Sequence, residues 1–131
     1  MQNNLKPTAP VPGKIDLTYI QLVANGNSPF EAEMLLSLQS EIEQKMEAMR
    51  HDLDVSHREG VRLCAHSLKN LFGLLGCSRM RDAFLLMETE SMSVNNDWLR
   101  RHYASFKNDW MQVQGEIARL LATYDDRAAA A

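Results

Sequence analysis

Residues 56–76 read SHREGVRLCAHSLKNLFGLLG, and the apolar residues in this stretch recur at helical spacing. At about 100° per residue, the apolar side chains opposite His66 fall on one side of a helix. They are Val61, Cys64, Leu68, Leu71, Phe72 and Leu75. The spacing predicts an amphipathic helix that buries this side. Ser56 with Glu59 is typical of a capped helix start, and Gly76 is typical of a helix end.

The other side of this helix is polar. The residues around His66 on that side are Glu59, Arg62, Lys69, Asn70 and Gly73. His66 is therefore predicted to be exposed, with Lys69 one turn further on and able to place its ammonium group beside the ring. A glycine in an exposed helix interior costs about 1 kcal/mol relative to alanine. We therefore attribute Gly73 to the close approach of a partner.

Two helices are predicted before this stretch. A short helix begins near Asp16 and ends at Asn25-Gly26, a pair that favours a left-handed stop. A longer helix is predicted over residues 28–51, with Ser28 as its capping residue followed by proline. Its apolar residues at spacings of three and four form the inner face, and its charged residues, including Glu31, are expected mainly outside.

Two further helices are predicted after it. Ser78 can cap a helix whose apolar positions are Met80, Ala83, Phe84, Met87 and Met92. Residues 95–97, Asn-Asn-Asp, form a turn and cap before a final helix over residues 98–124. The inner face of this last helix is formed by Leu99, Tyr103, Phe106, Trp110, Val113, Ile117, Leu120 and Leu121.

The chain is thus predicted to be all-α. Short connections make sequential helices neighbours, which favours an antiparallel up-down four-helix bundle with a short extra N-terminal helix. We place the bundle at residues 15–124. Residues 1–14 contain three prolines without an apolar period and are expected to form a flexible arm, and residues 125–131 are expected to fray.

Composition narrows the function classes. The chain has 131 residues and a net charge of -3, so a single domain is expected and nucleic-acid binding is disfavoured. No window approaches the roughly 18 apolar residues of a membrane span, and the N-terminus lacks the apolar core of a secretory signal. We expect a cytoplasmic monomer. Cys64 and Cys77 lie in apolar helical pattern, which favours buried thiols over a disulfide or metal site.

Residues 65–77, AHSLKNLFGLLGC, resemble the motif of histidine-containing phosphotransfer (HPt) proteins. The family has His-x-Leu-Lys-Gly on a helix and a glycine ten residues after the histidine. His66, Leu68, Lys69 and Gly76 match these positions, and Asn70 stands where the family usually has glycine. The similarity extends to Glu88, where the family commonly has Leu-Glu, and to the upstream helix, so that nearly all of residues 15–122 is included.

The resemblance implies a phosphorelay intermediate without kinase activity of its own. Nε2 of His66 would accept a phosphoryl group from the aspartyl phosphate of a receiver domain and pass it to another receiver aspartate. Lys69 would stabilise the added charge, and Arg62, Asn70 and Gly73 would lie on the docking surface. The partners would be response-regulator receivers and a hybrid sensor histidine kinase. No cofactor of this chain is implied, because the receiver would hold Mg²⁺.

Two alternatives stay open. The first is a helical adaptor that binds a signalling protein through the same surface without phosphotransfer, an interpretation supported by Asn70. The second, a fragment of a larger hybrid kinase, is disfavoured by the initiating Met1 and the self-contained length. His51, His57 and His102 have no second ligand at zinc spacing, which argues against a metal site.

Overall fold

The computed structural model describes residues 14–130, with side chains through residue 126. Residues 14–130 form the helices α1 (Thr18–Ala24), α2 (Ser28–Asp54), α3 (Arg58–Leu75), α4 (Ser78–Glu90) and α5 (Asn96–Ala130), and no strand. The predicted all-α class is therefore confirmed. The arm predicted over residues 1–14 lies outside the described residues except for Lys14.

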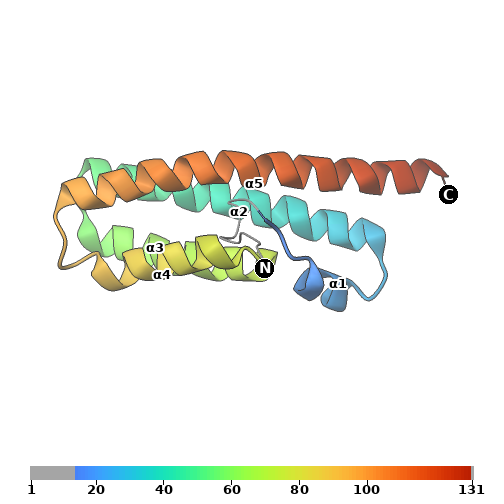
Figure 1. Cartoon of the computed structure of the whole chain (residues 1–131), viewed down its shortest axis with the longest axis horizontal. Coiled ribbons are helices and arrows are strands. Elements are labelled where there is room, and N and C mark those ends of the chain that lie inside the picture. The colour runs from blue at the N-terminus through green and yellow to red at the C-terminus, as the bar shows by residue number, and fades with distance from the viewer. Residues whose placement is uncertain (1–13, 131) are drawn as a thin grey trace, which may run out of the picture.

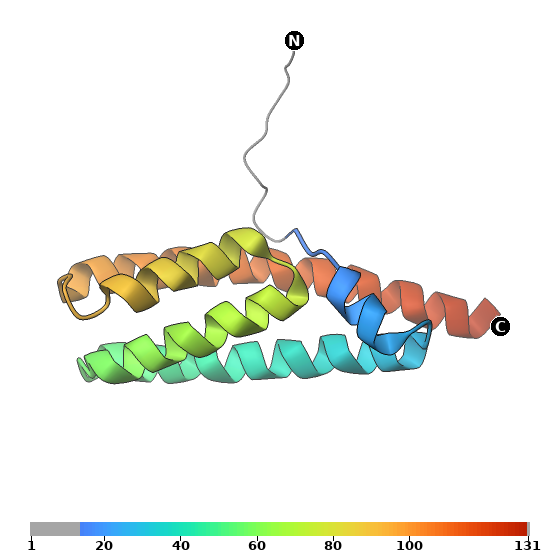
Figure 2. The same cartoon turned by 90° about the horizontal axis from the view of Figure 1, so that it is seen from below.

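Helices α2 to α5 lie side by side along the long axis of the molecule (Figure 1). α2 packs against α3 and α5, and α4 also packs against α3 and α5, so the four helices enclose a common core. α1 contacts α2 and α3 and lies near the C-terminal end of α3 (Figure 2). This arrangement leaves one side of α3 and α4 open to solvent.

The core contains the inner side of α3 that the apolar spacing predicted. All six of its apolar residues are buried, and Phe72 is fully inaccessible. The Phe72 ring stacks on Phe84 of α4 at 5.5 Å between centroids and meets Trp110 of α5 edge-on at 5.7 Å. Such ring pairs stabilise a core beyond the area that they bury. The rotation of α3 about its axis is thus determined by packing against two other helices.

The predicted starts of α2 and α3 were wrong by one or two residues. Asn27, rather than Ser28, caps α2, and its side chain accepts a hydrogen bond of 3.0 Å from the backbone N–H of Phe30. In the tight connection from α2 to α3, Ser56 has a left-handed φ of 55°. A capping residue needs an extended backbone, so the predicted capping box does not form. Glu59 pairs with Arg62 instead.

The later helices also differ from the prediction at their ends. α4 begins after the N-cap residue Cys77, with Ser78 as its first helical residue. α4 ends at Glu90, so Met92 lies in the following turn and is 59% exposed, not part of the core. Asn95 caps α5 as expected, accepting a hydrogen bond from the N–H of Trp98. α5 continues through Ala130, so residues 125–130, which were expected to fray, are helical.

Glu31 was predicted to lie outside the core, and this prediction was wrong. It is 7% exposed, and one of its carboxylate oxygens accepts a 2.7 Å hydrogen bond from the Tyr124 hydroxyl. A buried carboxylate is tolerated only where such partners replace water. The contact joins the first turn of α2 to the distal part of α5.

Gly76 is needed both for its backbone conformation and for the space that it leaves. It ends α3 with φ of 76°, and an added Cβ would lie 2.1 Å from the carbonyl oxygen of Asp16. We expect Gly76→Ala to lower the free energy of unfolding by about 2 kcal/mol or more, because left-handed φ costs an L residue about 1–2 kcal/mol and the backbone of Asp16 must also move. Urea denaturation measures this change.

Gly26→Ala is the matched control. Gly26 has a similar φ of 85°, but an added Cβ would meet no atom within 4 Å. Gly26→Ala should therefore show the conformational cost alone. Equal losses in the two variants would mean that the contact between Gly76 and Asp16 contributes nothing.

Candidate functional site

His66 projects from the middle of α3 on the side opposite the core. Its side chain is 50% exposed, whereas Ala65 and Leu68 beside it are fully buried. The exposure predicted from the helical spacing is therefore confirmed. Because the buried residues determine the rotation of α3, the imidazole is presented to solvent on a rigid element.

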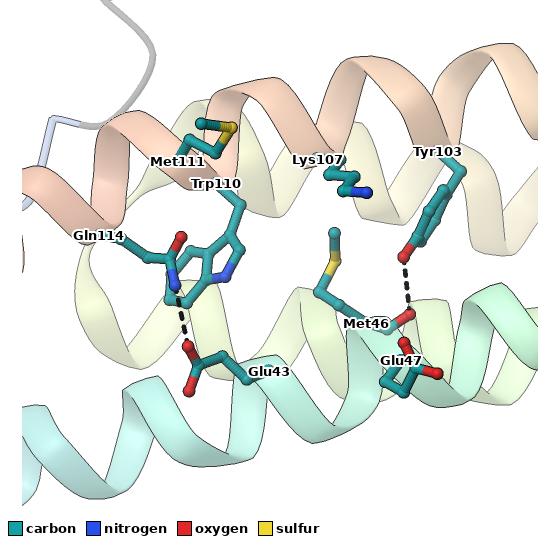
Figure 3. A pocket seen from close by; sticks show the side chains of 8 residues that line it. All are labelled: Glu43, Met46, Glu47, Tyr103, Lys107, Trp110, Met111 and Gln114. Atoms are coloured by element: carbon teal, nitrogen blue, oxygen red, sulfur yellow. Dashed lines mark hydrogen bonds between the residues drawn. The ribbon is translucent and has the colours of Figure 1, made fainter.

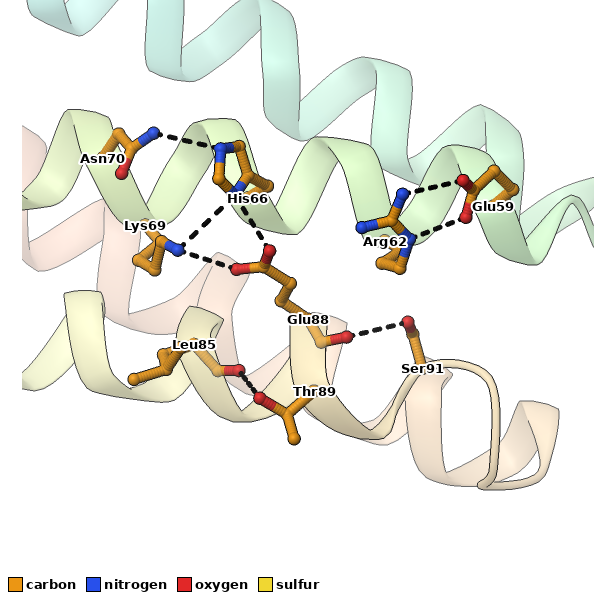
Figure 4. A network of polar contacts seen from close by, with 9 residues as sticks. All are labelled: Glu59, Arg62, His66, Lys69, Asn70, Leu85, Glu88, Thr89 and Ser91. Carbon is orange, nitrogen blue, oxygen red and sulfur yellow. Dashed lines mark hydrogen bonds and ion pairs between the residues drawn. The ribbon is translucent and has the colours of Figure 1, made fainter.

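The imidazole is held from the neighbouring helix by Glu88 of α4. The Glu88 Oε2 atom lies 2.8 Å from Nδ1 of His66 (Figure 4). The Glu88 side chain is 18% exposed, so this contact is more shielded from water than the outer edge of the ring. The carboxylate thus orients the ring through one of its two nitrogens.

This contact determines which ring nitrogen carries the proton in neutral imidazole. A carboxylate accepts hydrogen bonds, so the 2.8 Å contact requires hydrogen on Nδ1. Lys69 Nζ also lies 3.4 Å from Nδ1, but an ammonium group can only donate, and the shorter contact with Glu88 prevails. Nε2 is then left with its lone pair directed away from Glu88.

Lys69 shares the same carboxylate. Its Nζ atom lies 2.9 Å from Oε1 of Glu88, and both side chains are about four-fifths buried. The hydrogen bond from Lys69 holds the pKa of the Glu88 carboxyl below its usual range, the bond from His66 acts in the same direction, and partial burial opposes them. Glu88 therefore stays ionised at neutral pH and joins His66 to Lys69.

The other residues predicted for this surface have different contacts. Asn70 approaches Nε2 with its amide nitrogen at 3.5 Å. Arg62 donates to both oxygens of Glu59 at 2.6 and 2.7 Å, so its guanidinium is held beside Glu59. Gly73 faces α4, where an added Cβ would make only an ordinary contact of 3.6 Å with Arg81.

The contact of Glu88 with His66 was not predicted from the sequence, where Glu88 was only one of the positions that resemble the family. The position of Glu88 on α4 nevertheless indicated that its carboxylate has a partner. Glu88 follows Phe84 by four residues and so lies at the edge of the inner side of α4. A carboxylate at such an edge needs a partner, but its identity depends on how α3 and α4 pack.

The remaining histidines have other surroundings. Nδ1 of His57 lies 3.4 Å from Asp52, and His102 stacks on Trp98 and donates from Nδ1 to its carbonyl oxygen at 2.9 Å. Both cysteines are buried as predicted, and burial raises the pKa of the Cys64 thiol to about 11 and that of Cys77 to about 12. These thiols are therefore protonated at neutral pH.

Within residues 14–130 there is no group of three or more metal-ligating side chains, and no helix there is long and apolar enough to cross a membrane. A shallow groove of about 200 Å³ lies between α2 and α5 (Figure 3). It is lined by Glu43, Met46, Glu47, Tyr103, Lys107, Trp110, Met111 and Gln114. None of these is among the residues that contact His66, which are Lys69, Asn70 and Glu88.

The chain is similar to a known protein family. The family model described as "Hpt domain" matches residues 33–123, which span α2 to α5 and contain His66, Lys69 and Glu88. No curated protein and no solved structure gives a significant match. The matched segment covers more than half of the chain, and so the chain belongs to the Hpt-domain family, whose members are phosphotransfer carriers of two-component signalling.

Proposed function

We propose that this protein is a phosphorelay intermediate that accepts a phosphoryl group on Nε2 of His66 from a receiver aspartyl phosphate. It then passes the group to the aspartate of another receiver. The observation that carries the proposal is the half-exposed imidazole whose Nδ1 is held by Glu88, which leaves Nε2 as the nucleophile. We also propose that α2 to α5 form the antiparallel up-down bundle that the short connections favour.

The transfer forms one bond to phosphorus and breaks one. The Nε2 lone pair attacks phosphorus, the bond from phosphorus to the aspartate oxygen breaks, and the aspartate leaves as a carboxylate. The ring then carries phosphoryl on Nε2 and hydrogen on Nδ1, and so has a positive charge. Glu88, at 2.8 Å from Nδ1, offsets this charge, and onward transfer reverses the same steps.

The polar surface of α3 would receive the partner. Lys69 lies within 3.4 Å of the ring and can offset the negative charge of the phosphoryl group. Arg62, Asn70 and Gly73 would complete the docking surface. We expect a hybrid sensor kinase and response-regulator receivers as partners, with the receiver holding Mg²⁺, and no kinase activity in this chain, which would act as a monomer.

The direct test locates the label. The full chain is incubated with phosphorylated receivers of its source organism, digested with trypsin under alkaline conditions, and examined by mass spectrometry. Cleavage after Arg62 and Lys69 releases residues 63–69, in which His66 is the histidine. We expect acid-labile phosphate on this peptide. A chain that no receiver labels would not be a relay.

Glu88→Ala is expected to slow phosphotransfer about tenfold, because loss of one hydrogen bond to a charged group has about this effect. Without the carboxylate, hydrogen is no longer held on Nδ1 and the positive phosphorylated ring loses its counter-charge. Glu88→Gln keeps an acceptor without the charge, so its rate should lie between those of Glu88→Ala and the wild type. These rates are measured by stopping the transfer reaction at several times and determining the transferred label.

Glu90→Ala is the control for this prediction. It removes the same charge from α4, but two residues along a helix point about 200° apart, so Glu90 does not face His66. Its transfer rate should match that of the wild type. Equal slowing in Glu88→Ala and Glu90→Ala would indicate a general effect of charge on receiver docking and not a positioning role for Glu88.

A further inference from the structure

Asn70 has a contact with the reactive nitrogen that a glycine at this position could not make. Its amide nitrogen lies 3.5 Å from Nε2 of His66, and it approaches the ring from the side away from Glu88 and Lys69 (Figure 4). The two edges of the imidazole therefore face different groups. Nδ1 faces the carboxylate, and Nε2 faces the amide.

The direction of the amide follows from the tautomer of the ring. Hydrogen on Nδ1 is directed to Glu88, so Nε2 is an acceptor and favours the amide N–H of Asn70 over its carbonyl oxygen. At 3.5 Å this contact is longer than an ordinary hydrogen bond. It therefore holds the lone pair only weakly and does not prevent attack on phosphorus.

The two cations on this polar side of α3 are already paired. Lys69 is 2.9 Å from Glu88, and Arg62 is bound by both oxygens of Glu59. A phosphoryl group on Nε2 would place its oxygens on the side of the ring where Asn70 lies. The amide of Asn70 could then donate to these oxygens without breaking an ion pair.

We propose that Asn70 binds the phosphoryl group of phosphorylated His66 through its amide N–H and prolongs the life of the phosphohistidine. This inference rests on the proposed phosphotransfer function and deepens it. Asn70 slows the loss of the group to water and shifts the exchange with a receiver aspartate toward His66. The chain is thereby adapted to store the phosphoryl group.

The test labels the chain without any receiver. Potassium phosphoramidate donates the phosphoryl group: its nitrogen–phosphorus bond breaks, its protonated nitrogen leaves as ammonia, and a new bond forms to Nε2. After the donor is removed, the decay of label on residues 63–69 is followed by ³¹P NMR and mass spectrometry. His66→Gln provides the background, and all variants are full-length chains.

Asn70→Ala should shorten the half-life of the label about threefold, a change typical of one exposed hydrogen bond. Aspartate has the same size as asparagine but offers only acceptors and a negative charge. The half-life of the label in Asn70→Asp should therefore be at least as short as in Asn70→Ala. Gln44→Ala removes an exposed amide from α2 and should change nothing. In equilibrium with a receiver, Asn70→Ala should move about threefold more phosphoryl group to the receiver.

An unchanged or longer half-life in Asn70→Ala would overturn the inference, even if its transfer to receivers changed, because Asn70 would then act only in docking. In that case label on residues 63–69 of the wild type would still support the phosphotransfer function. If neither phosphoramidate nor any receiver labels residues 63–69, the function itself fails and the role of Asn70 fails with it.

Discussion

His66→Gln should abolish labelling by receivers while leaving the fold intact. Glutamine has no ring nitrogen to attack phosphorus, so label on residues 63–69 should fall to background. The side chain is 50% exposed, and substitutions at such positions usually change stability by less than about 0.5 kcal/mol. The glutamine amide can also still donate to Glu88. Label transfer and thermal unfolding, measured on the same preparation, test both statements.

The same variant separates the relay from the adaptor alternative. An adaptor would keep its partner binding in His66→Gln and would carry no label in the wild type. A relay should bind receivers in both forms and carry label only in the wild type. Label that persists in His66→Gln on residues 51–58 or 102–107, which hold the other histidines, would show that the acceptor is misassigned.

Phe72→Ala is expected to have the largest effect on stability, a loss of about 3–5 kcal/mol. Phe72 is fully buried, and its ring contacts Phe84 of α4 and Trp110 of α5. Truncation would open a cavity where three helices meet. The helices can close this cavity only in part, because their other contacts hold them in place. The midpoint of urea denaturation should fall with little change in its slope.

Leu63→Ala serves as the control on the same helix. Leu63 is 52% exposed, so its truncation should change the free energy of unfolding by less than about 0.5 kcal/mol. If Phe72→Ala costs less than about 1 kcal/mol, or no more than Leu63→Ala, the assigned inner side of α3 is wrong. His66 would then also be wrongly placed.

The rotation of α3 could be predicted because helical spacing is a local property. Residues three and four apart lie on one side of a helix whatever surrounds it, so the apolar run that includes Leu68 and Phe72 identified the buried side. The exposure of His66 was predicted from the same helical spacing. Helix ends were less predictable, because Asn27 and Ser28 are both good capping residues and the geometry of the connection decides between them.

The surroundings of Glu31 and Glu88 could not be predicted in this way. Glu31 and Glu88 occur in helices rich in charge, where an acidic residue is ordinarily solvated. Their partners are distant in the sequence: Tyr124 lies 93 residues from Glu31, and His66 lies 22 residues from Glu88. Hydrogen bonding between such residues depends on how the helices pack.

The amino-acid sequence alone was sufficient for the helical class, the inner side of α3 and the exposed position of His66, because each depends on spacing within one helix. Only the tertiary structure placed Glu88 against Nδ1 and paired it with Lys69. Those contacts join α3 to α4, and they determine which nitrogen of His66 keeps its lone pair. The packing of one helix on another thus decides the chemistry of a side chain whose exposure was already evident from the sequence.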